Sequence, residues 1–236
     1  MFCIYGYPRA GVRLLAGTLG THQDVKCPIP AGSSCSIVQL PSVNALTQML
    51  EDEGQKHNCI LLPAIAPPGS IAQQEEYAAV CEFIRVSRIP VIEVRRKDIL
   101  RRELSLRIAV HTGKWSIPII ATWHRTKHVM ILSELDLQRL MYALEVDREE
   151  DKLSACNPYV VIYEDMLLNF ATVTEAVQRY IGLQPDVLLP VTGRMDVRKI
   201  RTVLLNYDDL KKQLGQTYPQ VFKVAEQNDE LFCPRG

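Results

Sequence analysis

Residues 2–15 read FCIYGYPRAGVRLL, and this stretch decides the fold class. A short apolar run stops at Pro8, and an apolar pattern of helical period begins after Gly11. This order predicts a strand, a tight loop and a helix. Such a loop directs backbone N–H groups and a helix N-terminus toward one point, which suits an anion such as phosphate. Arg9 adds a fixed charge there, and Gly11 lets the backbone approach closely. Taken alone, the stretch also fits a plain strand-to-helix turn with a solvated arginine.

The rest of the chain alternates short apolar runs with segments of helical period. The expected strands are 2–7, 36–40, 59–65, 90–94 and 159–163, and the expected helices are 12–19, 42–53, 70–87, 98–113, 133–151, 172–182 and 203–214. Alternating strands and helices predict an α/β fold with a mostly parallel central sheet flanked by helices. No linker or internal repeat divides the sequence, so we expect one domain over 1–236, with a helical C-terminal part from about 184.

Cap residues set the expected helix limits. Asp98 is a candidate N-cap, and Gly20, Gly113 and Gly182 are candidate C-terminal stops. Capping-box patterns occur at Ser70 with Gln73, Ser133 with Asp136, and Thr172 with Glu175.

Composition excludes several classes of protein. Lys and Arg total 27 and Asp and Glu total 27, so the formal net charge of zero argues against a generic nucleic-acid binder. The 7 cysteines form no Cys-x-x-Cys pair, which disfavours a metal cluster and a disulfide framework. No apolar run approaches the ~20 residues that span a bilayer, and with a strand expected from residue 2 we expect no signal peptide. We expect a cytoplasmic protein, or a catalytic fragment separated from an anchor.

A second basic cluster, the basic segment (residues 95–98, RRKD), follows the strand expected at 90–94. Ser105 lies two turns into the next helix. In a parallel sheet, ligands gather at the carboxyl ends of strands, so this segment and the first loop (residues 7–11) are expected to face one ligand. Two cationic sites on one edge suit a nucleotide with phosphates at two positions. The alternative is a solvated helix start, which we prefer for Arg101 and Arg102.

Five motifs, in order, resemble those of sulfotransferases that use 3′-phosphoadenylyl sulfate (PAPS), especially the bacterial trehalose-sulfotransferase-like branch. The first resembles the family's 5′-phosphosulfate loop, and the second resembles its 3′-phosphate element, a strand ending in a cation with Ser eight residues on. The motifs are Tyr7–Leu15, Lys97 to Ser105, Ser105 with Ala109 and 111–115 (HTGKW), 160–166 (VVIYEDM) with 180–183 (YIGL), and 205–210 (LNYDDL).

The resemblance implies transfer of a sulfuryl group from PAPS to a hydroxyl or amine of a small-molecule or carbohydrate acceptor, without a metal. Arg9 is then expected to stabilise charge on the leaving phosphate. Loop amides of Ala10, Gly11, Val12 and Arg13 are expected to hold the 5′-phosphate. The implied 3′-phosphate ligands are Arg96, Lys97 and Ser105. Arg194 and Arg198 fall where relatives have a loop over the nucleotide, and 163–165 (YED) is expected to orient the phosphate-binding residues.

Two departures from the family pattern keep an alternative open. Ala10 and Val12 replace the usual loop hydroxyls, with Arg13 as a candidate substitute donor. No family-type base is present, and His22 is the candidate base. The alternative is a catalytically degenerate sulfotransferase fold that binds a nucleotide or a protein partner without turnover. A P-loop kinase or NTPase is disfavoured, because no Gly-x-x-x-x-Gly-Lys-Ser/Thr occurs. The acceptor pocket is expected from 21–35 and 114–128.

Overall fold

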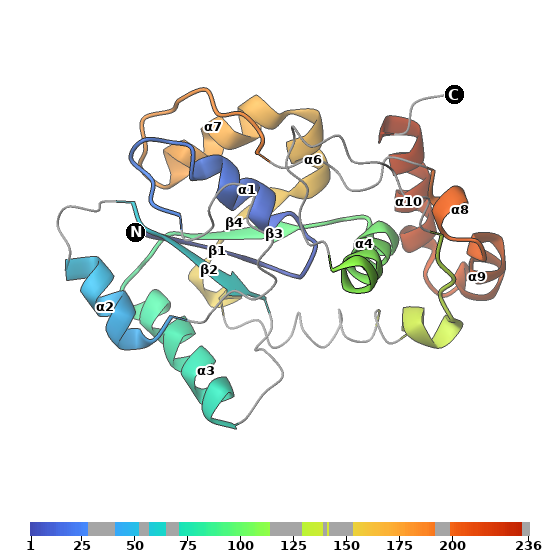
Figure 1. Cartoon of the computed structure of the whole chain (residues 1–236), viewed down its shortest axis with the longest axis horizontal. Coiled ribbons are helices and arrows are strands. Elements are labelled where there is room, and N and C mark those ends of the chain that lie inside the picture. The colour runs from blue at the N-terminus through green and yellow to red at the C-terminus, as the bar shows by residue number, and fades with distance from the viewer. Residues whose placement is uncertain are drawn as a thin grey trace.

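A parallel sheet in the order β2-β1-β3-β4 forms the centre of the molecule (Figure 1). Its strands are β1 (Phe2–Gly6), β2 (Cys59–Pro63), β3 (Val91–Arg95) and β4 (Tyr159–Ile162). The computed structural model describes residues 1–27, 41–51, 57–64, 71–113, 129–138, 141, 153–191 and 199–232. The predicted α/β class is confirmed, while the strand expected at 36–40 lies outside the described residues.

The register of the sheet brings the two predicted ligand-binding segments to the same edge. Gly6, the last residue of β1, pairs with Val94 of β3, and Arg95 pairs with Ile162 at the end of β4. β1 is buried along its whole length, which suits an internal strand of a sheet covered on both faces. The first loop, the basic segment and the start of the helix after β4 therefore leave the sheet side by side.

Helices cover both faces of the sheet (Figure 1). One face packs on α1 (Val12–Leu19), α6 (Tyr163–Leu168) and α7 (Phe170–Tyr180), with a core that includes Phe2 and Ile4. The other packs on α2 (Val43–Glu51) and α3 (Ile71–Val86), with a core that includes Cys3 and Tyr5. Alternate residues of β1 thus serve opposite cores, as strand geometry requires. A 3-10 turn, η1 (Ser154–Cys156), precedes β4.

A third core lies at one end of the molecule. It joins α4 (Ile99–Thr112) to α8 (Ile200–Val203), α9 (Tyr207–Leu214) and α10 (Pro219–Phe232) (Figure 1). Leu100, Leu104 and Ile108 of α4 are buried in it at the predicted spacing of four residues. α8 to α10 belong to the helical C-terminal part expected from about 184, whereas the single-domain division stays a prediction.

The predicted helix limits were right in most places. Asp98 accepts a hydrogen bond from the Arg101 amide and caps α4, and Gly113 ends it at φ 67°. Ser133 and Asp136 form their capping box with reciprocal bonds of 3.0 and 3.1 Å. The Thr172 box is wrong, because α7 begins at Phe170 with only Asn169 between it and α6.

Other predicted helix limits differ from the structure or fall on residues outside the described ranges. Of the helix expected at 203–214, only 207–214 form one helix, α9, because α8 ends at Val203; α10 follows from Pro219. Ser70 and most of 139–151 lie outside the described residues. Glu175, expected in the wrong capping box, instead forms an ion pair with Arg179 within α7.

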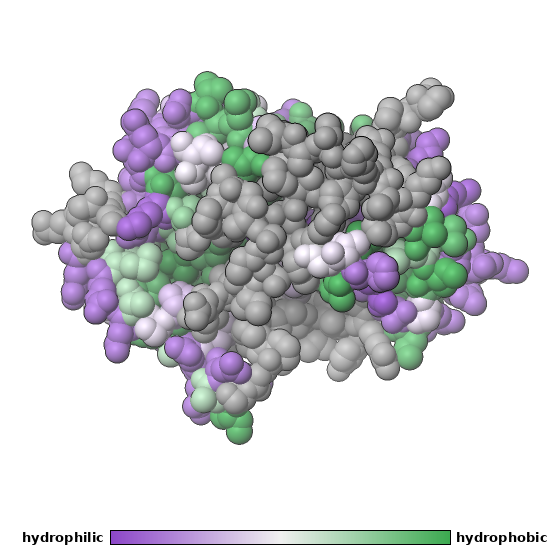
Figure 2. Space-filling view, in the orientation of Figure 1, coloured by the Kyte–Doolittle hydropathy of each residue, from purple (hydrophilic) through white to green (hydrophobic). Residues whose placement is uncertain are grey.

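Among the apolar side chains exposed on the face drawn in Figure 2 are some beyond α7 and some at the α8–α9 end. Val187 and Leu189 are exposed in the segment after α7, and Leu205 is exposed between α8 and α9. No helix in the described ranges is long and apolar enough to cross a membrane.

Candidate anion-binding site

The first loop turns tightly between β1 and α1. Arg9 and Gly11 both have positive φ, at 68° and 108°, and the Ala10 amide donates to the Tyr7 carbonyl at 3.0 Å. Gly11 is the N-cap of α1 and no side chain caps that helix. The N-terminus of α1 is thus left to satisfy its amides with a ligand or solvent, as anion-binding helix starts do.

The basic segment and Ser105 contact the first loop directly. Nε of Arg9 donates to Oγ of Ser105 at 2.9 Å, and Nη1 of Arg96 donates to the carbonyl oxygen of Arg9 at 3.3 Å. The structure therefore brings together Arg9, Arg96 and Ser105, which the sequence placed far apart. A ligand at this edge of the sheet can reach both segments at once.

The start of α6 holds the basic segment in place, as expected for 163–165. Both carboxylate oxygens of buried Glu164 accept backbone hydrogen bonds, from Lys97 at 3.0 Å and from Asp98 at 3.1 Å. Asp165 lies 3.6 Å from Nζ of Lys97. The Arg96 guanidinium lies over the Tyr163 ring, 4.7 Å from its centroid. Three consecutive residues thus position three consecutive residues of the basic segment.

Positive charges crowd this site. Burial, with repulsion from Arg96 and Arg13, lowers the pKa of Arg9 to about 10, while Tyr163 acts in the opposite direction. Within the part of the chain that the structure describes, the buried Nε of Arg96 has no hydrogen-bond partner. A buried donor without a partner costs free energy, so an incoming anion would be stabilised by both the charge and the free donor.

The expectation that Arg101 and Arg102 are solvated is wrong, because α4 packs against the C-terminal helices. Both side chains are buried, at 6% and 7% exposure. Arg101 forms ion pairs with Asp98, at 3.3 Å, and with Asp229 of α10. Arg102 lies over the Tyr7 ring, 4.9 Å from its centroid.

Asp98 links the basic segment to α10. Its carboxylate also accepts from Nδ2 of Asn228 at 3.0 Å, and burial raises its pKa. The sequence contains no local signal for this network, since Asn228 and Asp98 lie 130 residues apart.

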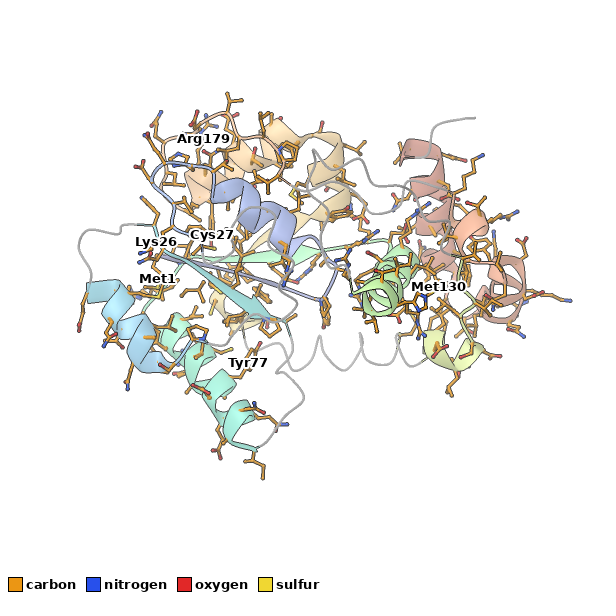
Figure 3. The ribbon with its side chains drawn as sticks, in the orientation of Figure 1. Met1, Lys26, Cys27, Tyr77, Met130 and Arg179 are labelled. Atoms are coloured by element: carbon orange, nitrogen blue, oxygen red, sulfur yellow. The ribbon has the colours of Figure 1, made fainter. Side chains whose placement is uncertain are left out.

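His22 is not placed to act as the base. It is buried, its Nε2 donates to the Gln184 carbonyl at 3.1 Å, and its Nδ1 accepts from the Asp24 amide at 3.1 Å. Both ring nitrogens are therefore occupied by backbone groups. His22 lies just after the end of α1, at Leu19. The segment that contains it leads to Lys26, which lies near Met1, where β1 begins, whereas the first loop follows the end of β1 (Figure 3).

Lys97 lies in the basic segment, Ala10 lies in the first loop, and Val12 is the first residue of α1. Lys97 is exposed, whereas Ala10 is fully buried and its amide donates to the Tyr7 carbonyl, so Ala10 offers a ligand neither a side-chain donor nor a free amide. Arg194 and Arg198 lie outside the described residues. Among the residues in the described ranges, no group of three or more His, Cys, Asp or Glu side chains is arranged to hold a metal ion.

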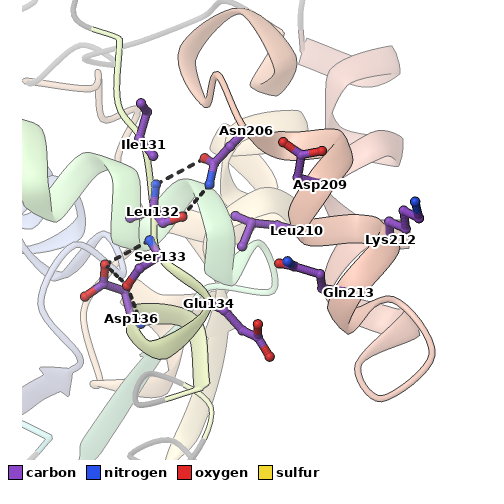
Figure 4. A pocket seen from close by; sticks show the side chains of 10 residues that line it. All are labelled: Ile131, Leu132, Ser133, Glu134, Asp136, Asn206, Asp209, Leu210, Lys212 and Gln213. Carbon is purple, nitrogen blue, oxygen red and sulfur yellow. Dashed lines mark hydrogen bonds between the residues drawn. The ribbon is translucent and has the colours of Figure 1, made fainter.

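A cavity of about 780 Å³ lies beside α9, and none of the residues that line it belongs to the first loop or the basic segment (Figure 4). Asn206 and Leu132 line it and are bonded to each other, through Leu132 N to Oδ1 at 3.2 Å and through Nδ2 to the Leu132 carbonyl. Ser133 and Asp136 are likewise paired. Much of the polar lining is therefore satisfied within the protein.

Comparison with known proteins gives two similar solved structures. The sulfotransferase from Alicyclobacillus acidocaldarius is 12% identical, with 95% of each chain covered and a TM-score of 0.49. The mouse sulfotransferase SULT7A1 complexed with PAP is 14% identical over 78% of this chain and 60% of that chain, with a TM-score of 0.39. No family model matches the chain, and no curated protein does. Nothing in these comparisons favours the trehalose-sulfotransferase-like branch.

Proposed function

We propose that this chain is a sulfotransferase that moves a sulfuryl group from PAPS to a hydroxyl or amine of a small-molecule or carbohydrate acceptor. One observation carries the proposal. Arg9 contacts both Ser105 and Arg96, so the first loop and the basic segment form one cationic site at the carboxyl edge of the sheet. A nucleotide with two phosphate positions needs such a pair of neighbouring cationic segments.

The residues present fit the donor nucleotide. Gly11 provides an uncapped helix start for the 5′-phosphate, with Arg9 and Arg13 as nearby charges. Arg96 has a free buried Nε for a second anion, and Lys97 and Ser105 lie in the same segment and the helix after it. Arg194 is proposed as a further contact to the nucleotide.

PAPS, when bound, supplies an activated sulfuryl group on the 5′-phosphate. Transfer forms a bond from sulfur to the acceptor atom and breaks the bond from sulfur to the phosphate oxygen. Adenosine 3′,5′-bisphosphate leaves with the electron pair of the broken bond, and the acceptor's proton passes to solvent. Arg9 is proposed to neutralise the negative charge that grows on that phosphate oxygen. The α1 amides hold the phosphate in line, so positioning and charge stabilisation account for most of the catalysis.

A nucleotide binder without turnover is the second candidate, favoured by specific residues. Ala10 and Val12 carry no hydroxyl for phosphate, and His22 is held by backbone groups. Each missing hydrogen bond to a charged group costs about 1.5–3 kcal/mol. The two candidates share a ligand site and differ in chemistry.

Calorimetry with adenosine 3′,5′-bisphosphate, beside adenosine 5′-monophosphate, tests the ligand site. Preference for the bisphosphate supports the proposal, and no binding of either nucleotide at high protein concentration would overturn it. Incubation with PAPS and a panel of hydroxyl and amine acceptors, followed by mass spectrometry, separates the enzyme from the binder. A sulfated product supports turnover, and bisphosphate binding without any product favours the binder.

A further inference from the structure

Two cysteines lie side by side where the segment after α1 meets the start of β2. The Lys26 amide donates to the His57 carbonyl at 3.3 Å, and the Cys59 amide donates to the Lys26 carbonyl at 3.0 Å. These two bonds form a parallel bridge in which Lys26 pairs with Asn58. Cys27 and Cys59 are the next residues along, so they occupy neighbouring positions on adjacent parallel segments.

Both cysteine side chains lie on the same face of the sheet. Cys59 is buried in the core that the sheet shares with α1, and Cys27 is half-buried against that same core. Side chains alternate between faces along a strand, so partners in parallel register share a face. Adjacent strands lie about 4.8 Å apart, which falls within the Cα separations of about 4.4–6.8 Å that disulfides require.

The two thiols differ in exposure and in protonation. Burial raises the pKa of the Cys59 thiol, and a hydrogen bond with the Cys27 thiol acts in the same direction. The Cβ atom of Cys27 lies against Gly20, the C-cap of α1, where an added Cβ would come within 2.9 Å of it. Cys59 is therefore a buried, protonated thiol, whereas Cys27 is the member of the pair that solvent reaches.

We infer that Cys27 and Cys59 are a reversible disulfide site, which links the segment after α1 to β2 when the protein meets a disulfide oxidant such as glutathione disulfide. The Cys27 thiolate attacks one sulfur of the oxidant, and one glutathione leaves with the electron pair of the broken bond. The Cys59 thiol then loses its proton and attacks the Cys27 sulfur, which releases the second glutathione. Two protein thiols are oxidised and one glutathione disulfide is reduced. This inference does not depend on the proposed function.

The bond would hold one side of the sheet together. It closes a loop of the chain from 27 to 59 that contains α2. β2 is the outermost strand on its side of the described sheet, and an outer strand opens locally more readily than a central one. We therefore expect oxidation to slow hydrogen exchange of the Cys59 amide, which is bonded to the Lys26 carbonyl, by at least about tenfold.

The test incubates the full, folded chain with glutathione disulfide, blocks the remaining thiols and locates bonds by fragmentation of linked peptides in a mass spectrometer. We expect a bond between Cys27 and Cys59 without attached glutathione, which dithiothreitol reverses. Cys59→Ala should stop after the first step and raise the share of chains with glutathione on Cys27 at least about tenfold. Cys156→Ala is the matched control, since Cys156 is also half-buried but packs against the opposite face, and it should form the bond like the unmodified chain.

Three results in the unmodified chain would overturn the inference. These are free thiols at both positions after incubation, a lasting glutathione adduct on Cys27, and a main product in which either cysteine is bonded elsewhere. Because they need no variant, they apply even if Cys59→Ala does not fold, as judged by circular dichroism. Unchanged exchange of the Cys59 amide in the oxidised chain would overturn the role of the bond in holding β2.

Discussion

Nε of Arg9 donates a hydrogen bond to Oγ of Ser105 at 2.9 Å, although 96 residues separate the two in the chain. Parallel pairing of β1 with β3 makes this contact possible, because it brings the ends of both strands to one edge. Arg9 has positive φ, and its side chain reaches Ser105 of α4. The contact is the centre of the proposed site, and the predictions below depend on its neighbours.

Arg9→Ala is expected to lower the rate of sulfuryl transfer by at least about a hundredfold, because it removes a charge aimed at the leaving oxygen. Affinity for adenosine 3′,5′-bisphosphate should change by less than about tenfold, since Arg96 and the helix start remain. Single-turnover kinetics and calorimetry measure the two effects. Arg179→Ala, on the exposed outer side of α7, is the control. Unchanged turnover in Arg9→Ala would remove Arg9 from the mechanism.

Arg9→Met tests the free-energy cost of the buried charge. Burial and neighbouring arginines lower the pKa of Arg9 to about 10, so between about pH 10 and its unfolded pKa the unfolded chain binds more protons than the folded one. Folding stability of the unmodified chain therefore rises with pH in that window. Below the window, the folded chain bears the full free-energy cost of burying the charged Arg9. We expect Arg9→Met to be more stable by about 1–2 kcal/mol at pH 8, after allowance for solvent screening.

The measurement is urea unfolding of both proteins at pH 8 and pH 10.5. The stability difference should narrow at the higher pH, because the unmodified protein then loses the charge in its folded state. A gap of constant size across this range would contradict the stated cause.

Glu164→Ala is expected to lower the free energy of unfolding by about 3 kcal/mol, because two amide donors lose a charged acceptor in a buried position. Glu164→Gln keeps one carbonyl acceptor and should lose about half as much. Urea unfolding measures both. Asp165→Ala is the control, since the Asp165–Lys97 pair is half exposed and such pairs contribute about 0–1 kcal/mol. Equal losses in Glu164→Ala and Asp165→Ala would show that the amide contacts contribute little.

Gly11→Ala and Gly113→Ala separate backbone strain from a steric clash. Both glycines have positive φ, which costs a residue with a Cβ about 1–2 kcal/mol. A Cβ at Gly113 meets no described atom within 4 Å, whereas one at Gly11 meets the Tyr163 ring at 2.5 Å. Thermal unfolding should show Gly11→Ala as the less stable variant by about 1–3 kcal/mol. Similar losses in the two variants would mean that the ring yields freely.

Arg101→Met is expected to cost about 3–5 kcal/mol of stability, because it leaves the carboxylates of Asp98 and Asp229 without their shared cation. The double variant Arg101→Met/Asp229→Asn should recover part of this loss, since one uncompensated charge is gone. Urea unfolding of both variants and of Asp229→Asn completes a double-mutant cycle. A loss below about 1 kcal/mol in Arg101→Met would show that water replaces the guanidinium.

Local patterns were enough to find most of the fold. The apolar runs at 2–6 and 91–94, the helix between Gly11 and Gly20, and the Asp98 cap all follow from period, cap and glycine chemistry acting over a few residues. The alternation of strands and helices then restricted the sheet to parallel pairing. For the same reason, the meeting of the first loop with the basic segment was predictable, because it depends on strand direction more than on side-chain detail.

Contacts between segments that are distant in the sequence could be identified only in the folded chain. Arg101 is buried with Asp229 of α10 as its partner, and Nε2 of His22 is bonded to the Gln184 carbonyl beyond α7. A charged or polar side chain looks the same in sequence whether it is solvated or paired, because its environment comes from residues brought near by packing. The order of strand, loop and helix and the charges of the loop are local properties of the chain. Which partner each polar side chain binds depends on tertiary packing.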